Sequence, residues 1–290
     1  MSQNPLSISA QIMPSFNFVL QFNHISLIRD IRNINRANEP IDGLKLRITC
    51  DVPVFDKIEA KLPEIPARFN DVIGEIPLRV DTKYLAGLTE AVNAQTSISL
   101  LYEDQVVSLF EHETKILPFD QCANPDEYPQ LLASFITPNH PAIPSILHDA
   151  SDILAKWGKD PSLEGYQDPD PNRIRDFVAA IFGAIQKKNI AYSNPPATST
   201  RSWTDGQRIR TVDAVLDQRL ATCMDFTLLF ASCIEAMHLH PILCLTEGHI
   251  FSGVWLTEDA SFDAPVIDDV KGIKTRMDNG HDELVLVECT

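Results

Sequence analysis

Apolar and polar positions alternate with a period of two in several short segments of the first 120 residues. Clear examples are 16–20, 44–48, 76–80 and 98–102, and Asp, Asn, Gly and Pro residues separate them. Such alternation puts every second side chain on one face, which is typical of half-buried β-strands. Short strands at this spacing predict a β-sandwich-like domain over residues 1–120. The stretch 81–94 also leaves room for a helical turn.

The period changes to that of helices from about residue 140. Apolar residues between Ile143 and Trp157 recur at i, i+3, i+4 and i+7, and Gly158 suits the position just past a helix end. A second helix is expected to begin with Asp170 as its cap and Pro171 in its first position. Residues 193–210 are expected to form a loop.

A third helix is predicted to begin near Thr222, and its apolar stripe runs to Met237. Strand candidates follow at 242–245, 250–256 and 284–288. An apolar helix followed by strands indicates an α+β domain in which the helix packs on the sheet. We place this second domain at 130–290, because the Pro- and Asp-rich segment 118–129 separates the two patterns.

Charge and composition narrow the classes of function. The chain has 290 residues, 24 of them basic and 40 acidic, which gives a net charge of −16. Such a surface repels phosphate backbones, so direct binding of nucleic acid by this region is not expected. No apolar run approaches the roughly 20 residues that a membrane helix needs, and the N-terminus lacks a secretory pattern. Six cysteines without a C-x-x-C pair suggest reduced thiols and a cytoplasmic location.

The most informative residue is Cys223, which is predicted to lie at a helix N-terminus. Thr222 can cap the helix, and Asp225 three residues later completes a pattern that resembles a capping box. The helix dipole and the free first-turn N–H groups favour the thiolate, which is the nucleophilic form of cysteine. The same N–H groups can stabilise an oxyanion after the thiolate attacks a carbonyl.

A cysteine nucleophile also needs an imidazole and a group that orients it. His249 follows Gly248 at the start of a predicted strand, and Glu288 lies at the end of the next strand. A helix followed by two strands can return the second strand to the helix N-terminus. We therefore predict a catalytic triad of Cys223, His249 and Glu288.

This order of residues resembles the transglutaminase-like branch of papain-like cysteine enzymes. The matching segments are 221–223, 249–251 and 288–290, where the family often has G-x-C, H-A-W and an Asp-Pro-Thr-like ending. Here Glu replaces Asp, Ala221 replaces Gly, and about 25 residues are inserted before the third strand. The resemblance implies acyl transfer through a thioester on protein or peptide substrates, with no cofactor and no metal.

The resemblance leaves two assignments open. The inserted residues Asp268 and Asp269 are alternatives to Glu288 as the triad acid. Related enzymes place an oxyanion-hole amide shortly before the nucleophile, which makes Gln218 a fourth catalytic candidate. Tyr192 is a further candidate for the oxyanion site, as tyrosines serve there in some relatives.

Most of the chain is also similar to the N-terminal region of large bacterial proteins that continue into a superfamily 1 helicase and often a Vsr-like nuclease. The segments that carry this similarity are 137–143, 206–210, 223–229 and 248–255. The resemblance implies helicase and nuclease domains beyond Thr290 in the same polypeptide, and a role in defence against phage.

Two other interpretations use the same residues. A zinc site could be formed from His238, His240, Cys244 and His249, although their spacing fits no closed motif. Alternatively, the pocket could be catalytically inactive and bind a peptide or regulate the domains that follow. A contact between Cys223 and His249 would favour the enzyme, and a side chain that blocks Cys223 would favour the inactive module.

Overall fold

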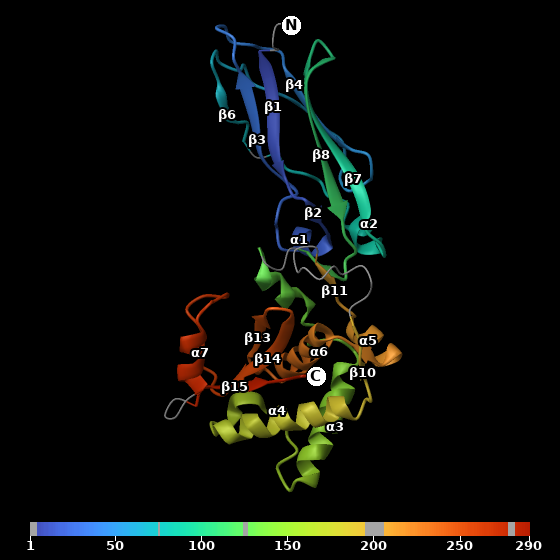
Figure 1. The fold of residues 1–290 in the computed structure, drawn as a ribbon, viewed down its shortest axis with the longest axis vertical. Helices are drawn as coiled ribbons and strands as arrows, with labels where there is room; N and C mark the ends of the chain where they lie inside the picture. Colours follow the sequence, from blue (N-terminus) through green and yellow to red (C-terminus); the bar gives the residue numbers. More distant parts are fainter. Residues whose placement is uncertain (1–4, 75, 124–126, 195–205, 278–281) are drawn as a thin grey trace. The chain divides into compact units, whose positions relative to one another are not determined.

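The computed structural model describes residues 5–74, 76–123, 127–194, 206–277 and 282–290 (Figure 1). The chain divides into two compact units, Met1–Ala123 and Asn124–Thr290. The division falls within the Pro- and Asp-rich segment 118–129. Helices and several separate sheets occur in one chain, which confirms the predicted α+β class.

The first unit consists mainly of antiparallel strands in two sheets. The three-stranded sheet has the order β1-β3-β6, and the five-stranded sheet has the order β2-β8-β7-β4-β5. The Ile8 amide donates to the Ser108 hydroxyl at 3.0 Å, which links a strand of one sheet to a strand of the other. The elements are β1 (Leu6–Ile12), β2 (Ser15–Phe16), α1 (Phe18–Phe22), β3 (Ile28–Asn35), β4 (Lys45–Cys50), β5 (Ile58–Lys61), β6 (Asn70–Val72), α2 (Thr82–Gly87), β7 (Val92–Tyr102), β8 (Gln105–Ile116) and β9 (Gln121–Cys122).

Two of the four example strands were predicted correctly, as β4 and as the end of β7. The prediction for 16–20 is wrong, because buried Asn17 ends β2 and caps α1 by accepting a hydrogen bond from the Leu20 amide. The prediction for 76–80 is also wrong, since only an isolated bridge between Phe55 and Val80 forms there. Pro77 has no N–H to donate to a ladder, and this weakens strand formation in that segment.

The second unit packs helices on a small antiparallel sheet of order β13-β14-β15. Its buried core joins α3, α4 and α6 to the sheet. The elements are η1 (Pro129–Phe135), α3 (Ile143–Lys156), η2 (Gly165–Gln167), α4 (Pro171–Gln186), β10 (Ala191–Tyr192), β11 (Gln207–Arg208), α5 (Val212–Gln218), β12 (Leu220–Ala221), α6 (Cys223–Ala236), β13 (Pro241–Thr246), β14 (His249–Trp255), α7 (Val270–Met277) and β15 (Leu284–Val287).

The main elements of this unit agree with the sequence pattern. The helices predicted after residue 142, at Pro171 and at Thr222 are confirmed as α3, α4 and α6, and the three strands as β13, β14 and β15. The loop predicted at 193–210 contains β11, and its residues 195–205 lie outside the described part. The pattern missed α5, α7 and the parallel pair β10–β12.

The insertion between β14 and β15 leaves the sheet and returns to it at one point. The Leu256 amide donates to the Glu283 carbonyl at 2.8 Å, which brings the two ends of the inserted segment together. Within the insertion, Arg276 lies over the Trp255 ring at 5.1 Å and binds Glu283 at 2.7 Å. These contacts hold α7 beside the end of β14.

Candidate active site

Helix α6 begins with a complete capping box. The Thr222 hydroxyl accepts a hydrogen bond from the Asp225 amide at 3.2 Å, and the Asp225 carboxylate accepts one from the Thr222 amide at 2.8 Å. Cys223 is the first residue of the helix and is buried, with 8% of its surface exposed. The predicted position of Cys223 at a helix N-terminus is therefore confirmed.

A buried ion pair fixes this helix end. The Asp225 side chain is fully buried and binds both the amide of Arg210, at 2.8 Å, and its guanidinium, at 2.9 Å. A buried carboxylate of this kind needs partners on all sides, and here both oxygens are occupied. Asp225 thus holds the preceding segment against the first turn of α6.

The capping box decides which amides remain available at the start of α6. The first amides of a helix have no acceptor within the helix. The Thr222 and Asp225 amides bind each other's side chains, and the Phe226 amide binds the Thr222 carbonyl. In the described part of the chain, the amides of Cys223 and Met224 have no acceptor. These two N–H groups are available for an anion beside the thiol.

The imidazole and the acid come from neighbouring strands. His249 is the first residue of β14, after a tight turn in which Gly248 has a φ of +72°. Its Nε2 atom lies 2.7 Å from Oε2 of Glu288, which directly follows β15. This bond occupies Nε2, so Nδ1 is the ring nitrogen left for proton exchange.

The sheet brings this pair toward the start of α6. The hydroxyl of Thr227, one helical turn after Cys223, donates to the Ile250 carbonyl at 3.2 Å in a buried contact. Ser252 pairs with Val287, and this register continues toward Glu288 at the end of β15. The residues next to His249 and Glu288 are therefore packed on the first turns of α6.

Tyr192 joins the same neighbourhood from a separate segment. It pairs with Ala221 in the short parallel ladder β10–β12, two residues before Cys223. Partial burial raises the pKa of Tyr192. The negative charge of Cys223 as a thiolate, a hydrogen bond to Cys223 and the negative charge of Glu288 raise this pKa further. A hydrogen bond that raises this pKa is one in which the phenol donates to the sulfur. The pKa of Tyr192 therefore depends on both the Cys223 thiol and the Glu288 carboxylate.

The carboxylate of Glu288 is stabilised in its charged form. Burial alone would raise the pKa of Glu288, but hydrogen bonds from Thr290 and His249 outweigh this effect and leave the pKa below its ordinary value. The Thr290 amide and hydroxyl both donate to Oε1, at 3.1 and 2.7 Å. Glu288 is thus an ionised acceptor for the His249 ring over most of the pH range.

The thiol and the imidazole are not bonded to each other. Among the residues that the structure describes, no hydrogen bond joins the Cys223 sulfur to the His249 ring. The Cys223 thiol contributes to the raised pKa of Tyr192, and the His249 ring is bonded by Glu288. The site therefore holds a bonded imidazole–carboxylate pair and, separately, a thiol with a neighbouring phenol.

Gln218 does not take part in this arrangement. It is the last residue of α5 and is exposed, and Arg219 after it turns away in the left-handed conformation with a φ of +50°. The carboxamide that reaches the start of α6 belongs to Gln207, whose Nε2 lies 3.4 Å from the Thr222 hydroxyl. Gln207 was not predicted from the sequence, because sixteen positions and an intervening helix separate it from Cys223.

The two aspartates of the insertion lie elsewhere. Asp269 accepts a hydrogen bond from the Gly272 amide at 2.9 Å, at the start of α7, and Asp268 is exposed. Of the three acids considered from the sequence, Glu288 is the one whose carboxylate the structure brings to the His249 ring.

The residues of the zinc alternative have separate surroundings. His238 leaves α6 in the left-handed conformation with a φ of +59°, and the His240 ring packs on Tyr166 at 5.3 Å. Burial raises the pKa of Cys244 to about 11. Within the described ranges, no group of three or more His, Cys, Asp or Glu side chains is arranged to hold a metal ion.

The other thiols are held in their neutral form. Burial raises the pKa of Cys122, Cys233 and Cys289 to about 12, and that of Cys50 is raised by burial as well. All six cysteines of the chain lie in the described part, and each is a free thiol.

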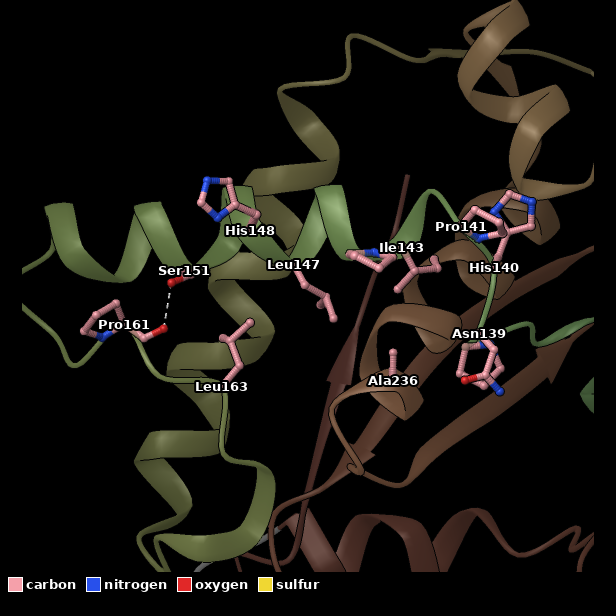
Figure 2. A pocket seen from close by; sticks show the side chains of 12 residues that line it. Asn139, His140, Pro141, Ile143, Leu147, His148, Ser151, Pro161, Leu163 and Ala236 are labelled. Atoms are coloured by element: carbon pink, nitrogen blue, oxygen red, sulfur yellow. Dashed lines mark hydrogen bonds between the residues drawn. The ribbon is translucent and has the colours of Figure 1, made fainter.

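A groove of about 690 Å³ lies at the other end of α6 (Figure 2). Ala236 from α6 faces Leu147 and Ile143 of α3 and Leu163 of the following loop. Prolines and aliphatic side chains form most of its wall, and the Ser151 hydroxyl closes one side by donating to the Pro161 carbonyl at 2.7 Å. None of the candidate catalytic residues lines this groove.

Over the described residues, none of the helices combines the length and the apolar character needed to traverse a membrane. Comparison with family models, curated proteins and solved structures found no match for this chain.

Proposed function

We propose that the second unit is a transglutaminase-like, papain-like cysteine enzyme that transfers acyl groups through a thioester at Cys223. The observation that carries this proposal is the His249–Glu288 pair at 2.7 Å, together with the raised pKa of Tyr192, which senses both Cys223 and Glu288. A nucleophile, a base and an orienting acid therefore share one small region. The first unit serves in this proposal as a β-sandwich-like accessory domain.

The reaction begins when Nδ1 of His249 takes the proton of the Cys223 thiol and the sulfur attacks the carbonyl carbon of an amide. A carbon–sulfur bond forms, and the carbonyl electrons move to oxygen, where the Cys223 amide and the Tyr192 phenol can donate hydrogen bonds. Gln207 replaces Gln218 as the candidate side-chain amide, since its carboxamide reaches Thr222. The carbon–nitrogen bond then breaks, and Nδ1 of His249 gives its proton to the leaving amine.

The thioester is resolved in a second step. If His249 takes a proton from water, the water oxygen bonds to the acyl carbon, the carbon–sulfur bond breaks and His249 returns the proton to the sulfur, so the products are a carboxylic acid and the free thiol. If it takes a proton from an amine, a new amide forms and the reaction is a transamidation. We favour hydrolysis of protein substrates, as in a protease or amidohydrolase, over protein cross-linking.

The first step requires His249 and Cys223 to approach each other. Catalytic hydrogen bonds are often long in enzymes without substrate and shorten when the substrate binds. The His249 side chain is 36% exposed and so has room to turn its ring about the Glu288 contact. Tyr192, with 58% of its surface exposed, can release the sulfur at the same time.

Mass spectrometry of cell proteins tests the reaction and separates its two outcomes. Extracts incubated with the wild-type chain are expected to acquire new peptide termini that are absent after incubation with Cys223→Ala. New isopeptide bonds in place of new termini would assign transamidation. If the wild type produces neither product, acyl transfer by this site is contradicted.

A second candidate function is a catalytically inactive module that binds peptides. The observations that favour it are the absence of a Cys223–His249 hydrogen bond among the described residues and the Tyr192 phenol on the buried sulfur. Such a module would bind a peptide equally well with cysteine or alanine at position 223. Peptide binding that is unchanged by Cys223→Ala, in a chain without turnover, would decide for this alternative.

We further propose that this region works in the cytoplasm as the front part of a longer polypeptide with helicase and nuclease domains that acts against phage. The six free thiols suit a reducing compartment, and the net charge of −16 suits a part that leaves nucleic-acid binding to other domains. A substrate protein that is cut only in infected cells would support this proposal.

A further inference from the structure

The three residues after β15 form a compact arrangement around the Glu288 carboxylate. One oxygen, Oε2, faces His249 at 2.7 Å. The other, Oε1, accepts two hydrogen bonds from Thr290, at 3.1 Å from the amide and 2.7 Å from the hydroxyl. Both oxygens are therefore held, each by a different residue.

A glutamate needs such a restraint more than an aspartate does. Its side chain has one additional rotatable bond, and each rotamer that must be frozen costs conformational entropy. The Glu288 side chain is also 53% exposed, so packing contributes little to its orientation. Hydrogen bonds to a charged acceptor are stronger than those between neutral groups, and Thr290 supplies two of them.

Cys289 ties this arrangement to helix α6. Its thiol is buried, and burial raises its pKa to about 12, so it remains neutral. The thiol donates to the Val287 carbonyl at 3.5 Å, and its side chain belongs to the buried core that includes Phe226 and Phe230 of α6. Cys289 thus packs toward the helix that carries the thiol nucleophile, while Glu288 reaches the His249 ring and Thr290 reaches the Glu288 carboxylate.

On this basis, and resting on the function proposed above, we propose that Thr290 is a positioning residue that clamps the Glu288 carboxylate and so fixes the orientation and protonation of His249. A carboxylate held at Oε1 presents Oε2 to Nε2–H. The proton then stays on Nε2, and Nδ1 is free to accept a proton from Cys223 or from water.

The clamp has a definite pH dependence. The hydrogen bonds of Thr290 stabilise the ionised carboxylate, and the pKa of Glu288 is lowered. A group of this kind supports the folded, charged arrangement above the unfolded pKa and loses that support as the pH falls through the lowered pKa. Removing the hydroxyl weakens the ionised form, so the carboxylate should become protonated at a higher pH.

Carbon-13 NMR titration of the Glu288 carboxyl group in the 290-residue chain measures this effect directly. In Thr290→Val, the titration midpoint of Glu288 should lie about one pH unit higher than in the wild type. A shift of this size corresponds to the loss of one charge-assisted hydrogen bond. Thr290→Ser keeps the hydroxyl and should restore the wild-type midpoint. An unchanged midpoint in Thr290→Val would overturn the clamp.

The rate of Cys223 alkylation by iodoacetamide gives the matching functional measurement. At mildly acidic pH, Thr290→Val should slow the alkylation by about threefold to tenfold, while Thr290→Ser and the exposed helix variant Thr275→Val should leave it unchanged. An equal loss in Thr275→Val would contradict a specific role for Thr290. If wild-type Cys223 reacts no faster than a buried thiol, the proposed enzyme function fails, while the NMR midpoint still tests the clamp.

Discussion

Helix α6 starts at Cys223 and ends at Ala236, and the residues around its two ends differ in kind. Its 14 residues span about 20 Å. The first turn is surrounded by a fully buried carboxylate, an arginine, a phenol and an imidazole–carboxylate pair. The last turn lies beside a groove that is lined mainly by prolines and aliphatic side chains. Just after the helix, the chain turns at His238, which has a left-handed backbone conformation.

This difference shows how one helix can serve both chemistry and packing. N–H groups without an acceptor in the helix, and the positive end of the dipole, occur only at the start of the helix. Polar and ionisable groups gain from that end, and the capping box leaves the Cys223 and Met224 amides available for a ligand. The other end has no such donors, and it closes the core with Met237 and Leu239.

The largest expected difference between the two parts of α6 concerns thiol reactivity. Cys223 and Cys233 lie on the same helix, but burial raises the pKa of Cys233 to about 12. At neutral pH, Cys223→Ala should abolish labelling of the native chain by a thiol-directed electrophile, and Cys233→Ala should not reduce it. Peptide mapping by mass spectrometry identifies the labelled residue. Undiminished labelling of Cys223→Ala would exclude Cys223 as the nucleophile.

The next largest difference concerns stability. Asp225→Ala removes the partner of Arg210 and of the Thr222 amide, and it should lower the free energy of unfolding by about 3 kcal/mol. Glu235→Ala replaces an exposed acid near the other end of the helix and should change the free energy of unfolding by less than about 0.5 kcal/mol. Urea unfolding followed by circular dichroism measures both. Equal losses would show that the capping network contributes nothing specific.

The smallest difference concerns the two residues that flank the helix. Thr222→Ala removes the cap and should cost about 1 kcal/mol. His238→Gly removes the strain of a left-handed conformation and should raise the free energy of unfolding by about 0.5 kcal/mol. The gain is small because glycine has a greater conformational entropy in the unfolded chain. Thermal unfolding of the two variants should therefore shift in opposite directions, and a shift in the same direction would contradict this comparison.

Local signals explain what could be predicted from the sequence. The start of α6 is encoded in four consecutive residues, 222–225, so the capping box was predicted without knowledge of the fold. The pairing of His249 with Glu288 followed from the order of the strands, and the structure places these side chains 2.7 Å apart. Both features depend on one helix and one small sheet that are close in sequence.

Contacts without a local pattern were missed or wrongly assigned. Tyr192 approaches Cys223 through a ladder of two residues per strand, which is too short for any periodicity. Gln207 reaches Thr222 across α5, and the proximity of Gln218 in sequence was misleading because that helix ends with Gln218 exposed. Helix α7 has no buried residue and so carries no apolar stripe that a period could reveal.

The inserted segment offers a practical site for engineering. Because the Leu256 amide and the Glu283 carbonyl meet at 2.8 Å, the chain between them begins and ends at a single point beside the sheet. The entropy of closing a loop grows slowly with its length, so extra sequence between these residues should cost little stability. A fluorescent protein inserted within the exposed stretch 263–266 should then leave the fold of this unit and the ladder between β14 and β15 intact.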